Sequence, residues 1–325
     1  MNAFVCSCAG PNPLAIRPRL ASAASDYHRL SGGRGVASRV MTFCRRNVLA
    51  FFVTVASASA ADAVVHRELP YALPKNERQS LDVFAPAGSK GRPVVVWIHG
   101  GGWQRGDKSG VKLKPQAFVD RGYVFVPINY RFIPVVKMQD MASDVAHAIA
   151  WVHGHIAEYG GDPKTLFVMG HSAGAQLAAL VCTDGSYLKA AGVGLNIIKG
   201  CVPVDGDTFY PGLQIDLAEA RPGARLPSSY RIKFPEGNDR ELSSVVHVGK
   251  DKGIPPFLIV HIADNPESGT VLQAQVLAKA LTDFKIPVKV LGVPGKTHVT
   301  LDSDLGVPHD LATQAMIEFV AQYAR

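Results

Sequence analysis

The stretch TLFVMGHSAG at residues 165–174 decides the fold, because it joins an apolar run to a G-x-S-x-G motif. The run at 165–169 has the length and composition of a buried strand, and a helical pattern follows Ser172. Glycines two residues either side of the serine permit a sharp turn that has no room for side chains. The motif therefore predicts a strand–turn–helix unit that presents Ser172 as a nucleophile.

Apolar runs and helical patterns alternate on both sides of this unit. Most runs are apolar on both faces, as central parallel strands are. The alternation predicts one α/β domain over residues 63–325, with right-handed crossovers. Strands are expected at 80–84, 93–98, 123–129, 165–169, 198–204, 256–262 and 288–293, and helices at 114–121, 139–159, 173–182, 271–284 and 308–323.

Residues 206–252 interrupt this alternation of strands and helices, because they contain no clear strand. Long excursions inside compact domains are usually lids or binding loops. We therefore expect a lid-like insertion whose apolar side chains wall a substrate pocket. The predicted pocket residues are Phe209 and Tyr210 from this segment, and Trp103 from an earlier loop.

A second glycine-rich motif, HGGGW at 99–103, follows the apolar run at 93–98. Successive glycines let backbone N–H groups turn toward a developing oxyanion without steric obstruction. We expect an oxyanion hole made by the N–H groups of Gly100 and Gly101, completed by that of Ala173.

A serine nucleophile needs a histidine base. On this type of fold the expected chain order is Ser, then Asp or Glu, then His. His298 lies in a small polar loop after the last predicted strand, from which an imidazole can reach the carboxyl edge of the sheet. His298 is the predicted base. The other histidines after Ser172, which are His247, His261 and His309, are interpreted as structural or surface residues.

The base needs an acid that orients it. Asp264 ends the strand predicted at 256–262, one helix before His298, and is the predicted acid. Glu267 in the same loop, and Asp205 or Asp207 after the strand at 198–204, remain alternatives.

Residues 1–62 are expected to be a leader. Residues 41–62 combine paired arginines, Arg45 and Arg46, with a short apolar run and small-x-small cleavage sites, as a secretory signal peptide does. Met41 is a possible true initiator, with 1–40 a mis-assigned start. We expect export to the periplasm or the medium by the Sec route, with a twin-arginine route as the alternative.

The charge and the motifs exclude several classes of protein. The chain has 34 basic and 27 acidic residues, but seven arginines and one aspartate fall within 1–60, so the remainder is nearly neutral. Nucleic-acid binding is therefore not expected. No apolar run is long enough to span a membrane. No nucleotide motif and no metal-ligand spacing is present, so neither a cofactor nor a metal is expected.

Two cysteines, Cys182 and Cys201, remain beyond the leader. The first ends the helix predicted after Ser172, and the second lies near the start of the next strand. Both thiols should therefore lie at the same level on neighbouring elements. A disulfide and a pair of buried free thiols are both compatible with this placement.

These motifs resemble the α/β-hydrolases of the carboxylesterase group, which includes hormone-sensitive-lipase-like esterases and arylformamidases. The matching stretches are HGGGW at 99–103, NYR at 129–131, the helical stretch 151–162 that ends in YGGD, GHSAG at 170–174 and SSVVH at 243–247. The resemblance implies an eight-stranded, mostly parallel sheet flanked by helices. It also implies a Ser172–Asp264–His298 triad with oxyanion donors at Gly100, Gly101 and Ala173.

The expected activity is that of a secreted serine hydrolase that cleaves a small-molecule carboxylic ester. Hydrolysis of a formamide or amide by the same triad is the alternative, since leaving-group preference depends on the pocket. A non-catalytic binding module is disfavoured, because no triad member is missing. The oligomeric state is left open.

Overall fold

A computed structural model describes residues 62–265 and 269–325. The predicted leader, apart from Asp62, lies outside the described residues, and so does Glu267. The leader, its cleavage and the choice between Met1 and Met41 therefore stay predictions.

The core of the described residues is one eight-stranded sheet in the order β1-β2-β4-β3-β5-β6-β7-β8. All pairings from β4 to β8 are parallel, whereas β1–β2 and β2–β4 are antiparallel. This confirms the predicted eight-stranded, mostly parallel sheet. The strands are β1 (Ala63–Pro70), β2 (Ser80–Pro86), β3 (Arg92–Ile98), β4 (Val124–Ile128), β5 (Gly161–His171), β6 (Ile198–Val204), β7 (Phe257–Ile262) and β8 (Val288–Val293).

Strand β1 was not among the expected strands. It lies at the edge of the sheet, and most of its residues are exposed. An exposed edge strand buries too few side chains to produce a continuous apolar run. The other seven strands were found by their apolar runs, and β2 to β7 are largely buried, whereas β8 at the opposite edge is only partly so.

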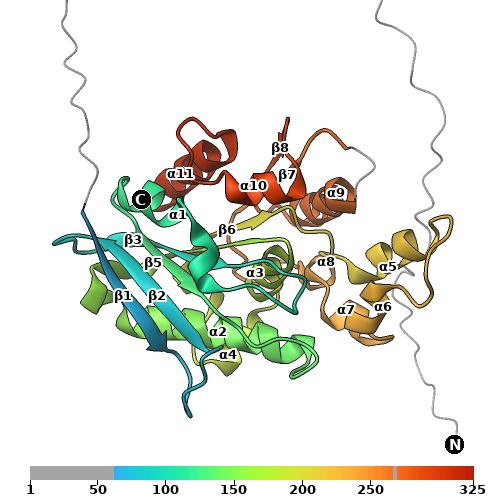
Figure 1. Ribbon diagram of the computed structural model, residues 1–325, viewed down its shortest axis with the longest axis horizontal. Coiled ribbons are helices and arrows are strands. Elements are labelled where there is room, and N and C mark those ends of the chain that lie inside the picture. Colours follow the sequence, from blue (N-terminus) through green and yellow to red (C-terminus); the bar gives the residue numbers. More distant parts are fainter. Residues whose placement is uncertain (1–61, 266–268) are drawn as a thin grey trace, which may run out of the picture. The chain divides into compact units, whose positions relative to one another are not determined.

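Helices cover both faces of the sheet (Figure 1), with α2 and α4 along one side and α1 and α11 along the other. The α-helices are α1 (Lys114–Val119), α2 (Met138–His155), α3 (Ala173–Thr183), α4 (Gly185–Ala190), α5 (Pro211–Glu219), α6 (Ser229–Lys233), α7 (Asn238–Glu241), α8 (Ser244–His247), α9 (Gly269–Asp283), α10 (His298–Ser303) and α11 (Leu311–Tyr323); single 3₁₀ turns lie at Lys108–Val111, Ile156–Tyr159 and Leu195–Ile197. None of the described helices is long and apolar enough to cross a membrane.

Strand β3 shows how one sheet supports two cores. Val94 and Val96 pack into the cluster shared with α2 and α3, whereas Val95 and Trp97 pack into the cluster shared with α1 and α11. Successive side chains of a strand point to opposite faces, so a strand that is covered on both sides must be apolar at every position. This is the physical reason for the continuous apolar runs in the sequence.

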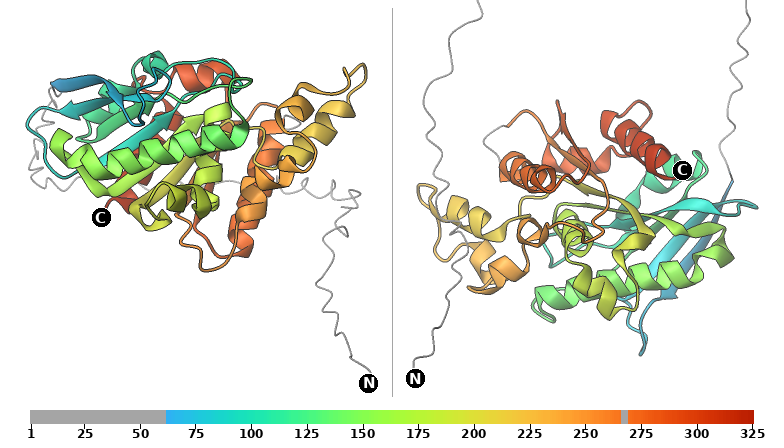
Figure 2. Two further views of the ribbon diagram at one scale, coloured as in Figure 1. Left: turned by 90° about the horizontal axis from the view of Figure 1, so that it is seen from below. Right: turned by 180° about the vertical axis from the view of Figure 1, so that it is seen from behind.

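Residues 206–252 form four short helices, α5 to α8, in place of further strands. Figures 1 and 2 show α5, α6 and α7 gathered at one end of the domain, and α5 packs against α9. We call residues 206–252 the cap. The predicted lid-like insertion is thus a small helical layer.

Cys182 at the end of α3 and Cys201 in β6 are neighbours, as the sequence predicted. Both are fully buried and are free thiols. Burial raises the pKa of the Cys201 thiol well above its usual value, and a hydrogen bond with the Cys182 thiol adds to the effect. A buried, protonated thiol reacts slowly with electrophiles, because the thiolate is the reactive form.

We therefore expect alkylating reagents to leave Cys182 and Cys201 unmodified in the folded protein and to modify both after denaturation without a reductant. Mass spectrometry of the two cysteine peptides gives the readout. Modification that requires a reductant even after denaturation would show a disulfide instead and would contradict the free-thiol state.

Candidate active site

Ser172 sits in a strained turn between β5 and α3. Its backbone has φ 56° and ψ −119°, a region that residues with a side chain rarely adopt. A Cβ on Gly174 would lie 2.2 Å from the carbonyl oxygen of Ile98, and one on Gly170 would lie 2.5 Å from that of Gly174. The turn can therefore form only with glycine at both positions. Strain of this kind costs about 1–3 kcal/mol and is typical of functional sites.

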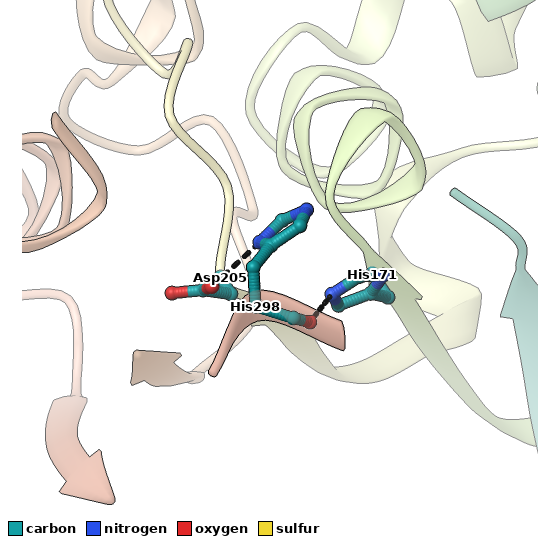
Figure 3. Close-up of side chains that lie close together, drawn as sticks. All are labelled: His171, Asp205 and His298. Carbon is teal, nitrogen blue, oxygen red and sulfur yellow. Dashed lines mark hydrogen bonds and ion pairs between the residues drawn. The ribbon is translucent and has the colours of Figure 1, made fainter. Parts of the chain in front are cut away.

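His298 is the first residue of α10 and faces the serine. Its Nε2 atom lies 3.0 Å from Ser172 Oγ. The N-terminal turn of α10 is capped by Thr297, whose side chain accepts a hydrogen bond from the N–H of Thr300. Nε2 of His171 donates a hydrogen bond to the backbone carbonyl of His298 at 3.0 Å. Figure 3 shows this contact. His171 thus fixes the backbone of His298, and the hydrogen bond to the serine hydroxyl comes from His298 itself.

The orienting carboxylate is Asp205, which follows β6. Its Oδ2 atom lies 2.7 Å from Nδ1 of His298, and Figure 3 shows the two side chains meeting. Its Oδ1 atom accepts a hydrogen bond from the N–H of Ile262 at 3.2 Å. The carboxylate is fully buried, whereas 47% of the His298 side chain is exposed. Ser172, His298 and Asp205 therefore form a continuous hydrogen-bonded relay.

The prediction that Asp264 orients the base is contradicted by this geometry. Asp264 is exposed after β7, and its carboxylate accepts a hydrogen bond from the N–H of Gly295. Strand β6 is the neighbour of β5, and the N–H of Ser172 donates a hydrogen bond to the carbonyl of Val204 at 2.9 Å, which places Asp205 beside the serine turn. Asp205, which the sequence left as an alternative, occupies the position.

The two ionisable members of the relay stabilise each other's charged form. Burial alone would raise the pKa of Asp205, but the hydrogen bonds from His298 and Ile262 outweigh it and hold the pKa below its usual value. The hydrogen bond to Asp205 raises the pKa of His298 above its ordinary 6.5, and burial opposes this in part. The site is therefore arranged to accept a proton on His298.

The relay also brings possible metal ligands together. One atom each from His171, Asp205 and His298 lies within 4.8 Å of the others. Their own hydrogen bonds explain this proximity, because Nδ1 of His298 is engaged by Asp205 and Nε2 of His171 by the His298 carbonyl. The cluster fits a proton relay better than a cation site.

The glycine-rich loop packs directly against the serine turn. A Cβ on Gly100 would lie 3.1 Å from Cβ of Ser172. Gly101 has φ +124°, and a Cβ there would lie 2.0 Å from the carbonyl oxygen of Arg105. Ala173 is the first residue of α3, where backbone N–H groups have no partner within the helix. The three predicted oxyanion donors therefore lie on two segments that meet at Ser172.

A cavity of about 430 Å³ opens above Ser172 and His298. Trp103 lines it, as predicted, and donates a hydrogen bond from Nε1 to Gln176 at 3.3 Å. The cap contributes polar side chains to the wall, namely Asp207, Gln214, Arg221, Ser229, Tyr230 and Lys233.

Two predicted pocket residues do not line this cavity. Phe209 is only 1% exposed, and its carbonyl accepts hydrogen bonds from Ser243 and Val245, so its ring belongs to the core beneath the cap. Tyr210 borders a separate cavity of about 240 Å³ beside Arg231. Sequence reasoning chose the aromatic residues and missed Lys233 and Arg221, because the insertion contains many charged residues and no pattern in the sequence distinguishes these two.

Several known proteins are similar to this chain in sequence or in fold. The family model BD-FAE matches residues 81–192. The chain is 30% identical to a probable isoprenylcysteine alpha-carbonyl methylesterase of Arabidopsis thaliana, over 69% of this chain and 49% of the relative. It is 32% identical to the probable carboxylic ester hydrolase LipM of Mycobacterium tuberculosis, over 68% of this chain and 51% of the relative. The chain spans about half the length of these relatives.

The chain belongs to the α/β-hydrolases of the carboxylesterase group. Solved structures show the same fold. A carbohydrate esterase from gut microbiota superposes with a TM-score of 0.64 at 18% identity, covering 82% of this chain and 97% of the other. Esterase B from Lactobacillus rhamnosis superposes with a TM-score of 0.66 at 21% identity, covering 81% and 86%.

The geometry of this α/β-hydrolase makes a direct prediction about His298. Asp205→Asn should lower the pKa of His298, because the hydrogen bond to Asp205 is the largest influence that raises it. Asp264→Asn should leave that pKa unchanged, because Asp264 bonds to Gly295 instead. Imidazole NMR titration of the two variants and the parent distinguishes the cases. If the pKa of His298 fell only in the Asp264→Asn variant, Asp264 would be its partner after all.

Proposed function

We propose that this protein hydrolyses carboxylic esters through an acyl-enzyme on Ser172. The observation that carries the proposal is the relay from Ser172 Oγ to His298 Nε2 at 3.0 Å and from His298 Nδ1 to Asp205 Oδ2 at 2.7 Å. This is the nucleophile–base–acid geometry of serine hydrolases. The ester hydrolases among the relatives support the same reaction class.

In the first half-reaction, His298 Nε2 takes the proton from Ser172 as Oγ attacks the ester carbonyl. Buried Asp205 stabilises the imidazolium that forms and keeps the remaining proton on Nδ1. The N–H groups of Gly100, Gly101 and Ala173 are placed to bind the oxyanion, and the N-terminus of α3 adds its dipole. The imidazolium then protonates the departing alkoxide, which leaves an acyl group on Ser172.

In the second half-reaction, water attacks the acyl-enzyme. His298 takes a proton from the water and returns it to Ser172 Oγ as the carboxylic acid leaves. Both half-reactions begin with neutral His298. Because Asp205 raises the pKa of His298, activity should increase with pH through a pKa above the ordinary value of 6.5.

We expect Ser172→Ala to lower kcat for a 4-nitrophenyl ester by about 10⁴- to 10⁶-fold, because triad members act as a unit. Asp205→Asn should lower it by roughly 10⁴-fold, because the amide favours the wrong imidazole tautomer. Asp264→Asn is the matched control and should retain near-parental activity. Release of 4-nitrophenolate is the measurement. An active Ser172→Ala protein would refute the acyl-enzyme mechanism, and an inactive Asp264→Asn beside an active Asp205→Asn would refute the assignment of the acid.

We also propose that the protein is exported, since residues 41–62 carry the features of a signal peptide. Expression of the full chain in a Gram-negative host should give a periplasmic or secreted product whose N-terminus lies near residue 61. N-terminal sequencing of fractionated material tests this. Full-length protein confined to the cytoplasm would contradict it.

A further inference from the structure

The wall of the catalytic cavity that the cap supplies carries two cationic side chains. Lys233 is the last residue of α6, and Arg221 follows α5. Both line the cavity that contains Ser172 and His298. A cavity that binds only an uncharged acyl chain is expected to have an apolar wall on the cap side, since burying an unpaired charge is unfavourable.

Lys233 is held beside the glycine-rich loop. Its ammonium lies 5.3 Å from the ring centroid of Trp103 and 5.9 Å from that of Tyr230. A Cβ on Gly102 would lie 4.0 Å from Nζ. The two aromatic rings therefore fix the cation beside the glycine-rich loop, a short distance from where the scissile carbonyl must bind.

The carboxylates of the cavity are engaged elsewhere. Asp205 pairs with His298, and Asp207 accepts a hydrogen bond from the hydroxyl of Tyr230. Within residues 62–265 and 269–325, no carboxylate lies at ion-pair distance from Lys233. Partial burial lowers the pKa of Lys233, and the more distant Asp207 opposes this only in part. An anion that enters the cavity would compensate this desolvation.

Arg231 of the cap provides a contrast to the two cations of this cavity. Arg231, on the same helix as Lys233, points away from the cavity and forms an ion pair with Glu219 at 2.8 Å. Among the described residues, Arg221 has no such carboxylate partner and lines the cavity. Within the part of the chain that the structure describes, Arg225, Arg240 and Lys252 of the cap also lack a carboxylate at ion-pair distance, but they do not line this cavity. Lys233 and Arg221 are the described cap cations that line it without such a partner.

We propose that Lys233, assisted by Arg221, binds a carboxylate of the substrate, so that the preferred substrates are esters bearing a carboxylate a few bonds from the scissile carbonyl. This inference rests on the proposed ester hydrolysis and specifies its substrate class. Lys233 acts here as a specificity-determining residue, while the reaction itself belongs to Ser172, His298 and Asp205.

The test compares pairs of esters that differ only in charge. One pair, 3-carboxyphenyl acetate and 3-carbamoylphenyl acetate, places the carboxylate on the alcohol part. The other, the monophenyl ester of adipic acid and its terminal carboxamide, places it on the acyl part. We expect kcat/KM to favour the anionic member of at least one pair by about tenfold to a hundredfold, as charged hydrogen bonds do. Added salt should reduce the preference.

Lys233→Met should abolish most of this preference while leaving the carboxamide substrates nearly unaffected. Lys233→Arg should retain it, and Arg221→Gln should reduce it by only a few-fold, since Arg221 is exposed. Lys137→Met is the matched control, because Lys137 lines a neighbouring cavity that Ser172 does not reach, and it should change nothing.

Equal turnover of anionic and neutral esters by the parent protein would overturn the proposal while leaving ester hydrolysis intact. The proposal would also be overturned if Lys233→Met lowered kcat/KM equally for both members of a pair and Lys233→Arg restored no preference. Such a result would show a structural role for Lys233. Failure of the parent protein to cleave any of the four esters would instead refute the proposed function itself.

Discussion

The left-handed turn at Ser172 is the constraint on which the site depends. Its backbone fits only because Gly170 and Gly174 let β5 and α3 approach the carbonyls of Ile98 and His99. The N–H of Ser172 donates to the carbonyl of Val204 at 2.9 Å, so the turn is also fixed to the end of β6. The next residue along β6 is Asp205, and the same backbone register therefore sets the nucleophile and the acid relative to each other.

Sequence reasoning identified what local patterns determine. The strand–turn–helix unit at Ser172 and the polar loop that carries His298 each have a signal within ten residues. The choice of acid depends on the order of β5, β6 and β7 in the sheet, because Asp205 and Asp264 both follow strands. Both aspartates satisfy the order Ser, Asp, His, and helical spacing and apolar runs do not distinguish them. The choice of Asp264, made because it ends the strand one helix before His298, was therefore wrong.

The composition of the cap also failed to predict which of its residues face the substrate. Its aromatic residues were expected to face the substrate, but Phe209 and Phe234 are buried, and the ring of Phe234 lies edge-on to Trp103 with centroids 5.3 Å apart. Short helices need their largest apolar side chains as anchors, because they bury little surface otherwise. The residues left to face the cavity are therefore polar ones such as Tyr230 and Lys233.

The hydrogen bond from Tyr230 to Asp207 ties α6 to the first residues of the cap, which directly follow the catalytic acid Asp205. Asp207 lies two residues after Asp205, and the chain then enters the core at Phe209. The five residues 205–209 thus orient the base, hold the cap and anchor both to the sheet. Because Tyr230 lies three residues before Lys233 on α6, the helix that carries the proposed anion-binding residue is hydrogen-bonded to the segment that follows the catalytic acid.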